Sequence, residues 1–125
     1  MMMINQRKDE PSVVWSDGTK IWYFDGKIHR EDGPAIEWSN GTKEWYRNGI
    51  LHREDGPAIE TPTGHKEWYY NGKLHREDGP AVEYHDGESY SWYHNGRAFV
   101  FSSFLNLIQD PMLKTMLILK FHKES

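Results

Sequence analysis

The sequence repeats itself with a period of 23 residues. Each copy begins at a proline and carries glycine and tryptophan at fixed later positions, namely Pro11, Pro34, Pro57 and Pro80, Gly18, Gly41, Gly64 and Gly87, and Trp22, Trp45 and Trp68. In the fourth copy Trp92 comes one residue late, and we interpret the extra residue within 88–91 as a β-bulge. A fixed period of this length indicates stacked units that contact mainly their neighbours. We therefore divide the chain into an N-terminal tail (1–10), four repeats (11–33, 34–56, 57–79 and 80–101) and a C-terminal segment (102–125).

Each repeat reads as short strands joined by tight turns. In the second copy an alternating apolar stretch is followed by Asn40-Gly41, and a stretch rich in β-formers is followed by Asn48-Gly49. Asn-Gly between such stretches favours β-hairpins. Gly56 closes the unit before the next proline, and a glycine there is free to take a positive φ. We expect a mainly β fold, an elongated antiparallel sheet of four β-hairpin repeats that is stable only as a stack.

The C-terminal segment carries helix signals. Ser102 and Ser103 can cap a short helix, and Asp110-Pro111 is an N-cap followed by proline at the first helical position. The second helix then has a wide apolar face, formed by Met112, Leu113, Met116, Leu117 and 119–121. We expect these helices to cap the last repeat, because the end of a repeat array exposes apolar surface. The alternative is a helix that dimerises or enters the groove of a partner.

The composition narrows the class of protein. Lys and Arg number 15 against 19 Asp and Glu, for a net charge of -4, so we expect no DNA binding. Cysteine is absent, which excludes disulfides and thiolate metal sites and fits a cytoplasmic protein. The N-terminus lacks the apolar segment of a signal peptide. No apolar run approaches the roughly 20 residues of a membrane helix, so we expect no membrane insertion.

The repeat resembles a known family. Its step, its Gly-x-x-x-Trp-Tyr-x-Asn-Gly segment and its trailing Leu-His are similar to MORN repeats, and closer to the MORN-variant repeats of bacterial and phage proteins. The resemblance covers about residues 11–99. It implies a curved sheet of successive hairpins and a binding role without catalysis. It also implies a phage or bacterial accessory protein, such as an inhibitor of a host defence or toxin protein.

The heptapeptide HREDGPA occurs three times, at 29–35, 52–58 and 75–81. Its residue types also serve catalysis and metal binding, but equivalent positions should lie two strands, about 9–10 Å, apart. The three histidines therefore cannot share one ion, and one copy offers at most two good ligands. An active site is one asymmetric set of groups, so a hydrolase or nuclease that uses His52, Glu54 and Asp55 is the least favoured interpretation. We predict no enzyme, no catalytic residue, no metal ligand and no cofactor.

We expect HREDGPA to be a structural corner. Its aspartate should accept hydrogen bonds from turn amides, and its arginine should pair with a carboxylate of the adjacent copy. Its histidine ring should lie beside the Trp-Tyr pair of a neighbour. A repeated ligand-binding corner is the alternative. The candidate residues of these corners are His29, His52, His75, Arg30, Arg53 and Arg76.

Two aromatic rows follow from the period, Trp22, Trp45, Trp68 and Trp92, and Tyr23, Tyr46, Tyr69 and Tyr93. Neighbours in a strand point to opposite faces, so the two rows should lie on opposite faces of the sheet. We expect one row to form the core and the other to be exposed in part. Exposed rings flanked by charges are typical of protein-binding hot spots, and they also stack on bases or sugars. The alternative is that both rows only brace the strands.

These observations predict a non-enzymatic protein-binding module. The candidate contact residues are the four tyrosines and the arginines and histidines of the corners. The alternative function is the binding of a small ligand, such as a nucleotide, a glycan or an anionic head group. The sheet edge or the C-terminal helix could also mediate self-association.

Overall fold

The computed structural model describes residues 3–4 and 10–121. It is mainly β, with two helices, α1 (Phe101–Leu105) and α2 (Pro111–Phe121), near the C-terminus. Its long sheet contains β1 (Met3–Ile4), β2 (Val13–Val14), β3 (Lys20–Ile21), β6 (Ile36–Glu37), β7 (Lys43–Glu44), β10 (Ile59–Glu60), β11 (Lys66–Glu67), β14 (Val82–Glu83), β15 (Tyr90–His94) and β16 (Arg97–Phe99), in that spatial order. Three small hairpins join β4 (Tyr23–Phe24) to β5 (Lys27–Ile28), β8 (Tyr46–Arg47) to β9 (Ile50–Leu51) and β12 (Tyr69–Tyr70) to β13 (Lys73–Leu74).

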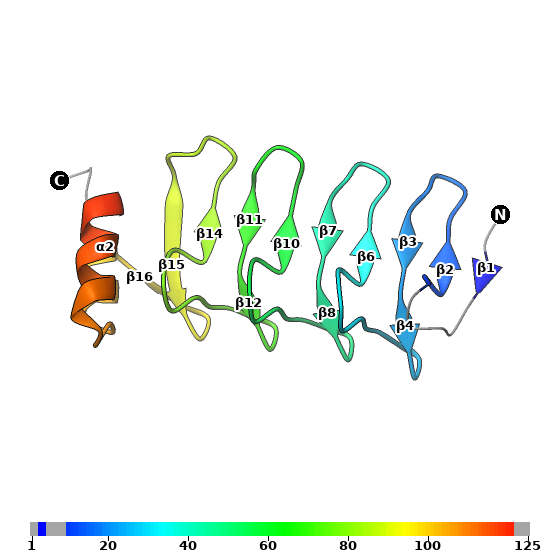
Figure 1. Cartoon of the computed structure of the whole chain (residues 1–125), viewed down its shortest axis with the longest axis horizontal. Helices are drawn as coiled ribbons and strands as arrows, with labels where there is room; N and C mark the ends of the chain where they lie inside the picture. Colours follow the sequence, from blue (N-terminus) through cyan, green and yellow to red (C-terminus); the bar gives the residue numbers. More distant parts are fainter. Residues whose placement is uncertain (1–2, 5–9, 122–125) are drawn as a thin grey trace.

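The sequence order of the hairpins is also their order in space, so the array is elongated (Figure 1). All strand pairs are antiparallel, which confirms the predicted sheet of hairpin repeats. Part of the expected N-terminal tail joins this sheet, because Met3–Ile4 pairs with Val13–Val14. The rest of 1–9 lies outside the described residues, as does the end of the predicted cap, 122–125.

Each of the first three repeats contains two hairpins (Figure 1). The upper hairpin belongs to the long sheet, and the lower hairpin is one of the three small ones. Their turns explain the Asn-Gly and Asp-Gly pairs. In the second repeat the upper turn has Gly41 at φ 96°, and the lower turn has Asn48 at φ 52° and Gly49 at φ 80°. Two successive positive φ angles define a type I′ turn, whose twist matches the strands that it joins. The lower turns of all four repeats share this geometry.

Successive repeats are bonded at both levels. In the upper layer the strands form one continuous ladder, and in the lower layer the Gly49 amide donates to Ile28 O at 2.7 Å. The Arg30 amide donates to Tyr46 O at 3.3 Å in the same layer. A lone two-stranded hairpin is marginal in water, so these lateral bonds make each repeat depend on its neighbours.

The register assigns the side chains of the paired strands to one of two faces. Ile36, Glu44, Ile59, Glu67 and Val82 are paired in succession across the sheet and so share a face. By alternation the tyrosine row lies on that side, which we call the Tyr face. The opposite side, which we call the Arg face, carries the tryptophan row, the fully buried alanines and a ladder of alternating charges, Lys20, Glu37, Lys43, Glu60, Lys66 and Glu83. The two aromatic rows therefore lie on opposite faces, as the alternation predicts.

The helices cap the Arg face of the last repeat. Trp92, Phe104, Leu117 and Phe121 form a buried cluster, in which the Trp92 and Phe104 ring centroids are 4.9 Å apart. The start of α2 is as predicted, because Asp110 Oδ1 accepts the Met112 amide at 3.0 Å. Figure 1 shows α2 at the C-terminal end of the array, so it leaves the Tyr face of the first three repeats without a second layer.

Two local predictions were wrong, namely the start of the first helix and the bulge in the fourth repeat. The first helix begins at Phe101, with Val100 at the N-cap and no side-chain cap, rather than after Ser102 and Ser103. The reason is packing, because in this register both Phe101 and Phe104 contact Trp92, with ring centroids 4.8 and 4.9 Å away.

The extra residue of the fourth repeat enlarges a turn instead of bulging a strand. The Tyr84 amide donates to Ser89 O, one residue further along than the equivalent bond from Trp38 to Thr42 O. The larger turn is held by Asp86. Hydrogen bonds from the Ser89 hydroxyl and from the Glu88 and Ser89 amides lower the pKa of this carboxyl to about 2. Among the described residues, neither helix is long and apolar enough to cross a membrane.

Candidate binding surface

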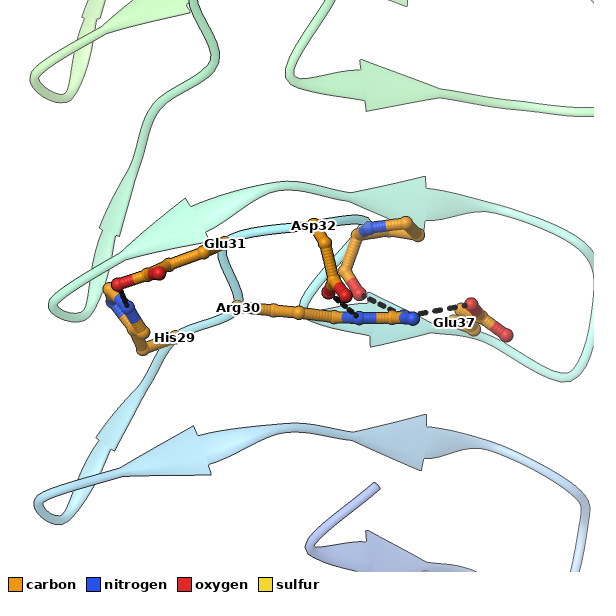
Figure 2. Close-up of polar contacts among 6 residues, drawn as sticks. His29, Arg30, Glu31, Asp32 and Glu37 are labelled. Atoms are coloured by element: carbon orange, nitrogen blue, oxygen red, sulfur yellow. Dashed lines mark hydrogen bonds and ion pairs between the residues drawn. The ribbon is translucent and has the colours of Figure 1, made fainter. Parts of the chain in front are cut away.

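The arginines of the corners lie over the tryptophan rings. The Arg30 guanidinium carbon lies 3.8 Å from the centroid of the Trp22 ring. Its Nε donates to Asp32 at 3.1 Å, and its Nη1 donates to Pro34 O at 3.1 Å and to Glu37 at 3.4 Å (Figure 2). Arg53 and Arg76 repeat every one of these contacts.

The predicted pairing with the adjacent copy is therefore confirmed, because Glu37, Glu60 and Glu83 each belong to the next repeat. The expected role of the aspartates is wrong. They accept from the arginine Nε of their own corner rather than from turn amides. The stacking of arginine on tryptophan carries no sequence signal of its own, since the two residues are eight positions apart.

The glycine of each corner makes room for the arginine. A Cβ on Gly56 would lie 2.9 Å from Arg53 Cζ, and a Cβ on Gly79 would lie 2.6 Å from Arg76 Cζ. Neither glycine has a positive φ, so the expected reason for glycine here was wrong. What the position excludes is a side chain, because the arginine occupies its place.

The histidines bind the next repeat. His52 Nδ1 accepts the Asn71 amide at 2.9 Å, and its Nε2 lies 3.3 Å from Glu54. His29 and His75 make the same contacts in their own corners. An accepting Nδ1 places the ring proton on Nε2, which then donates to the glutamate. His52 is 6% exposed, and its ring lies 4.5 Å from that of Tyr70 rather than beside a Trp-Tyr pair.

One corner brings together three groups of metal-ligand type. His75, Glu77 and His94 offer ligand atoms within 4.8 Å of one another, because the fourth repeat has His94 where the earlier ones have Arg47 and Tyr70. A metal needs the lone pair of a ring nitrogen, and a ligating histidine normally donates its other N–H. Here His75 Nδ1 accepts the Asn95 amide at 2.8 Å, so its Nε2 presents a proton. We therefore propose no metal site at this corner.

The tyrosine row is half-buried, and its two middle members donate hydrogen bonds to glutamates. Tyr46 and Tyr69 donate to Glu44 and Glu67, each at 3.0 Å. Burial raises the pKa of both hydroxyls to about 12, with a further contribution from the charge and the hydrogen bond of the glutamate. Tyr46 and Tyr69 thus brace the sheet and remain protonated donors.

The most exposed rings of the Tyr face were missed by the sequence analysis. They stand four residues after each proline, where the repeats carry Trp15, Trp38, Thr61 and Tyr84. Trp15 is 47% exposed, Trp38 43% and Tyr84 38%. A second position of this face, directly before the tryptophan of each repeat, also differs between copies, as Ile21, Glu44, Glu67 and Ser91. Comparing the repeats column by column would have found both positions, because the candidates we chose are the residues that the copies share.

A second variable row lies on the Arg face, at the lower hairpins. It consists of Phe24, Arg47, Tyr70 and His94. Beside it a hollow of about 910 Å³ lies between the second and third corners and is lined in part by Arg53, Trp68, Arg76 and Tyr70.

No family model, curated protein or solved structure matches this chain.

Proposed function

We propose that this protein is a non-enzymatic repeat scaffold that binds a protein partner through its Tyr face. One observation carries the proposal. The copies share the residues that join one repeat to the next, and they differ at exposed positions of both faces. The variable positions of the Tyr face belong to the continuous long sheet, whereas Phe24, Arg47 and Tyr70 of the Arg face lie in separate small hairpins. A residue that meets the same neighbour in every copy serves the stack, whereas an exposed residue that changes from copy to copy is free to fit something else.

The chemistry of the variable positions suits a protein contact. Trp15, Trp38 and Tyr84 are large, partly exposed rings on the same face as the half-buried tyrosines. Tryptophan and tyrosine are enriched in the residues that dominate the binding energy of protein interfaces. The face is also a continuous sheet surface with no helix over its first three repeats, which leaves room for an extended partner.

The absence of catalysis in this proposal is supported by how the corners are used. His52 accepts a backbone amide, and Arg53 stacks on Trp45 and bonds three acceptors. Both side chains already perform a structural task. The membership of the MORN-variant family and the role as an inhibitor of a host defence or toxin protein stay predictions.

The test compares two exposed rings on opposite faces. Trp38→Ala removes a ring from the Tyr face, and Phe24→Ala removes one of similar exposure, 46%, from the Arg face. A stoichiometric partner captured from bacterial lysate should be lost with Trp38→Ala and retained with Phe24→Ala. The reverse pattern would move the interface to the Arg face.

The second candidate function is the binding of a small ligand in the hollow between the second and third corners. Its lining combines aromatic rings with guanidinium groups, a chemistry that suits nucleotides and anionic head groups. A thermal-shift screen with nucleotides and glycans tests it, and Tyr70→Ala should abolish any stabilisation observed.

A further inference from the structure

We infer that the Tyr face selects a basic segment of its protein partner, with an Arg or Lys side chain placed against Glu44 and the Trp38 ring. This inference rests on the proposed function and names the chemistry of the partner. It is carried by the carboxylate of Glu44, by its contrast with the glutamates of the Arg face, and by the rings around it.

Glu44 is held by neutral donors on both of its oxygens. Oε2 accepts the Trp38 indole N–H at 2.9 Å, and Oε1 accepts the Tyr46 hydroxyl at 3.0 Å. Its direct neighbours across the sheet are Ile36 and Ile59, which carry no charge. Among the described residues, no Lys, Arg or His forms an ion pair with this carboxylate. The negative charge is thus positioned but not neutralised.

The glutamates of the Arg face, unlike Glu44, have cationic partners. Glu37, Glu60 and Glu83 each pair with an arginine at 2.9–3.4 Å and face a lysine across the ladder in at least one register pair. The fold therefore supplies a cation to every equivalent glutamate on one face and supplies none to Glu44 on the other. An outside cation would complete the same arrangement.

Glu67 extends the negative patch into the third repeat. It is separated from Glu44 by Ile59, which places the two carboxylates two strands, or about 9–10 Å, apart. Glu67 accepts Tyr69 at 3.0 Å and lies 2.7 Å from His65 Nε2. Glu44 has Thr42 where Glu67 has His65, so Glu44 is the carboxylate left to a partner.

The rings around Glu44 favour a side-chain cation over a metal ion. A guanidinium or ammonium group over an exposed tryptophan gains cation–π attraction, and Trp38 is held in place by its bond to the carboxylate. A hard metal ion would require six or more oxygen ligands, whereas Glu44 is flanked by Ile36 and Ile59. The net charge of -4 further favours a basic partner over a second copy of this chain.

The experiment titrates the full chain with a capped heptapeptide of alternating glycine and arginine. The readout is the indole N–H resonance of Trp38, identified with Trp38→Phe. We expect this resonance to move on titration with millimolar peptide. The same peptide with citrulline, which keeps the shape and lacks the charge, should bind about tenfold more weakly.

Two variants with the same change of net charge distinguish an effect of the Glu44 carboxylate from an effect of the overall charge. Glu44→Gln keeps an acceptor for Trp38 and removes the charge, so the arginine peptide should bind about tenfold more weakly. Glu88→Gln, in the exposed turn of the fourth repeat, should bind as the parent chain does. An unmoved Trp38 resonance, equal binding of the citrulline peptide, or equal losses in the two variants would each overturn the inference.

The captured partner separates this inference from the proposed function. A partner that is lost with Trp38→Ala and retained at unchanged affinity with Glu44→Gln would leave the Tyr face as the interface and refute its charge selectivity. A partner retained by both variants would refute both.

Discussion

Replacing Arg53 by alanine tests the arginine that links the second repeat to the third. Arg53 donates to Pro57 O at 3.0 Å and to Glu60 at 3.0 Å, and it lies 3.8 Å over Trp45. A hydrogen bond with a charged donor contributes about 1.5–3 kcal/mol. The stacking contributes about 0.5–2 kcal/mol, and each partly exposed ion pair about 0–1 kcal/mol. These contributions share one side chain and are not additive, so we expect a loss of about 3 kcal/mol.

The assay is equilibrium urea unfolding, followed by circular dichroism and tryptophan fluorescence. Arg47→Ala is the matched control, because Arg47 is more exposed and, among the residues that the structure describes, pairs with Glu54 alone, at 3.5 Å. We expect that control to lose less than about 1 kcal/mol. Arg53→Lys should recover little of the loss, since an ammonium lacks the planar fork that stacks and bonds at once. The reasoning would be refuted if Arg53→Ala were as mild as Arg47→Ala.

Three further predictions follow from the corners and the tyrosines. Gly56→Ala should destabilise the parent chain by about 1–3 kcal/mol and cost almost nothing in an Arg53→Ala background, which a double-mutant cycle of unfolding free energies measures. Tyr46 and Tyr69 should ionise near pH 12 in an ultraviolet titration. Because an unfolded tyrosine loses its proton near pH 10, the folded state binds more protons between these values, so stability should fall from about pH 10 to 12, and less so in the double Tyr→Phe variant. Zinc should not raise the unfolding temperature, and a rise that His94→Tyr abolishes would contradict the proton assignment at the third corner.

The hairpins could be predicted because their signals are local. Asn48-Gly49 needs only its own backbone to form a type I′ turn, and Asp110-Pro111 needs only the adjacent helix. The period of 23 then repeats the hairpin and requires that the copies stack. The opposite faces of the tryptophan and tyrosine rows follow from alternation alone.

The parts that could not be predicted depend on contacts between distant residues. The start of the first helix is decided by how Phe101 and Phe104 reach Trp92, and not by the serines that could have capped it. The conformation of Arg53 depends on Trp45 and on the carbonyl of Pro57. The predicted contact residues differ from the exposed rings of the Tyr face for a related reason. Residues common to all copies attract attention in a repeat, but the fold uses them internally.

Each corner bonds to the repeat that follows it, since His52 accepts an amide N–H of the next repeat and Arg53 donates to a glutamate of the next repeat. Any further copy inserted between two repeats would meet partners identical to those already present. The array can therefore lengthen or shorten by whole copies through duplication or loss of a gene segment, without the evolution of a new contact. The fourth repeat ends this series. After Gly96 it has no HREDGPA corner, and its chain turns into the helices that cover Trp92. A single terminal exchange of a corner for a helix thus determines the length of the sheet.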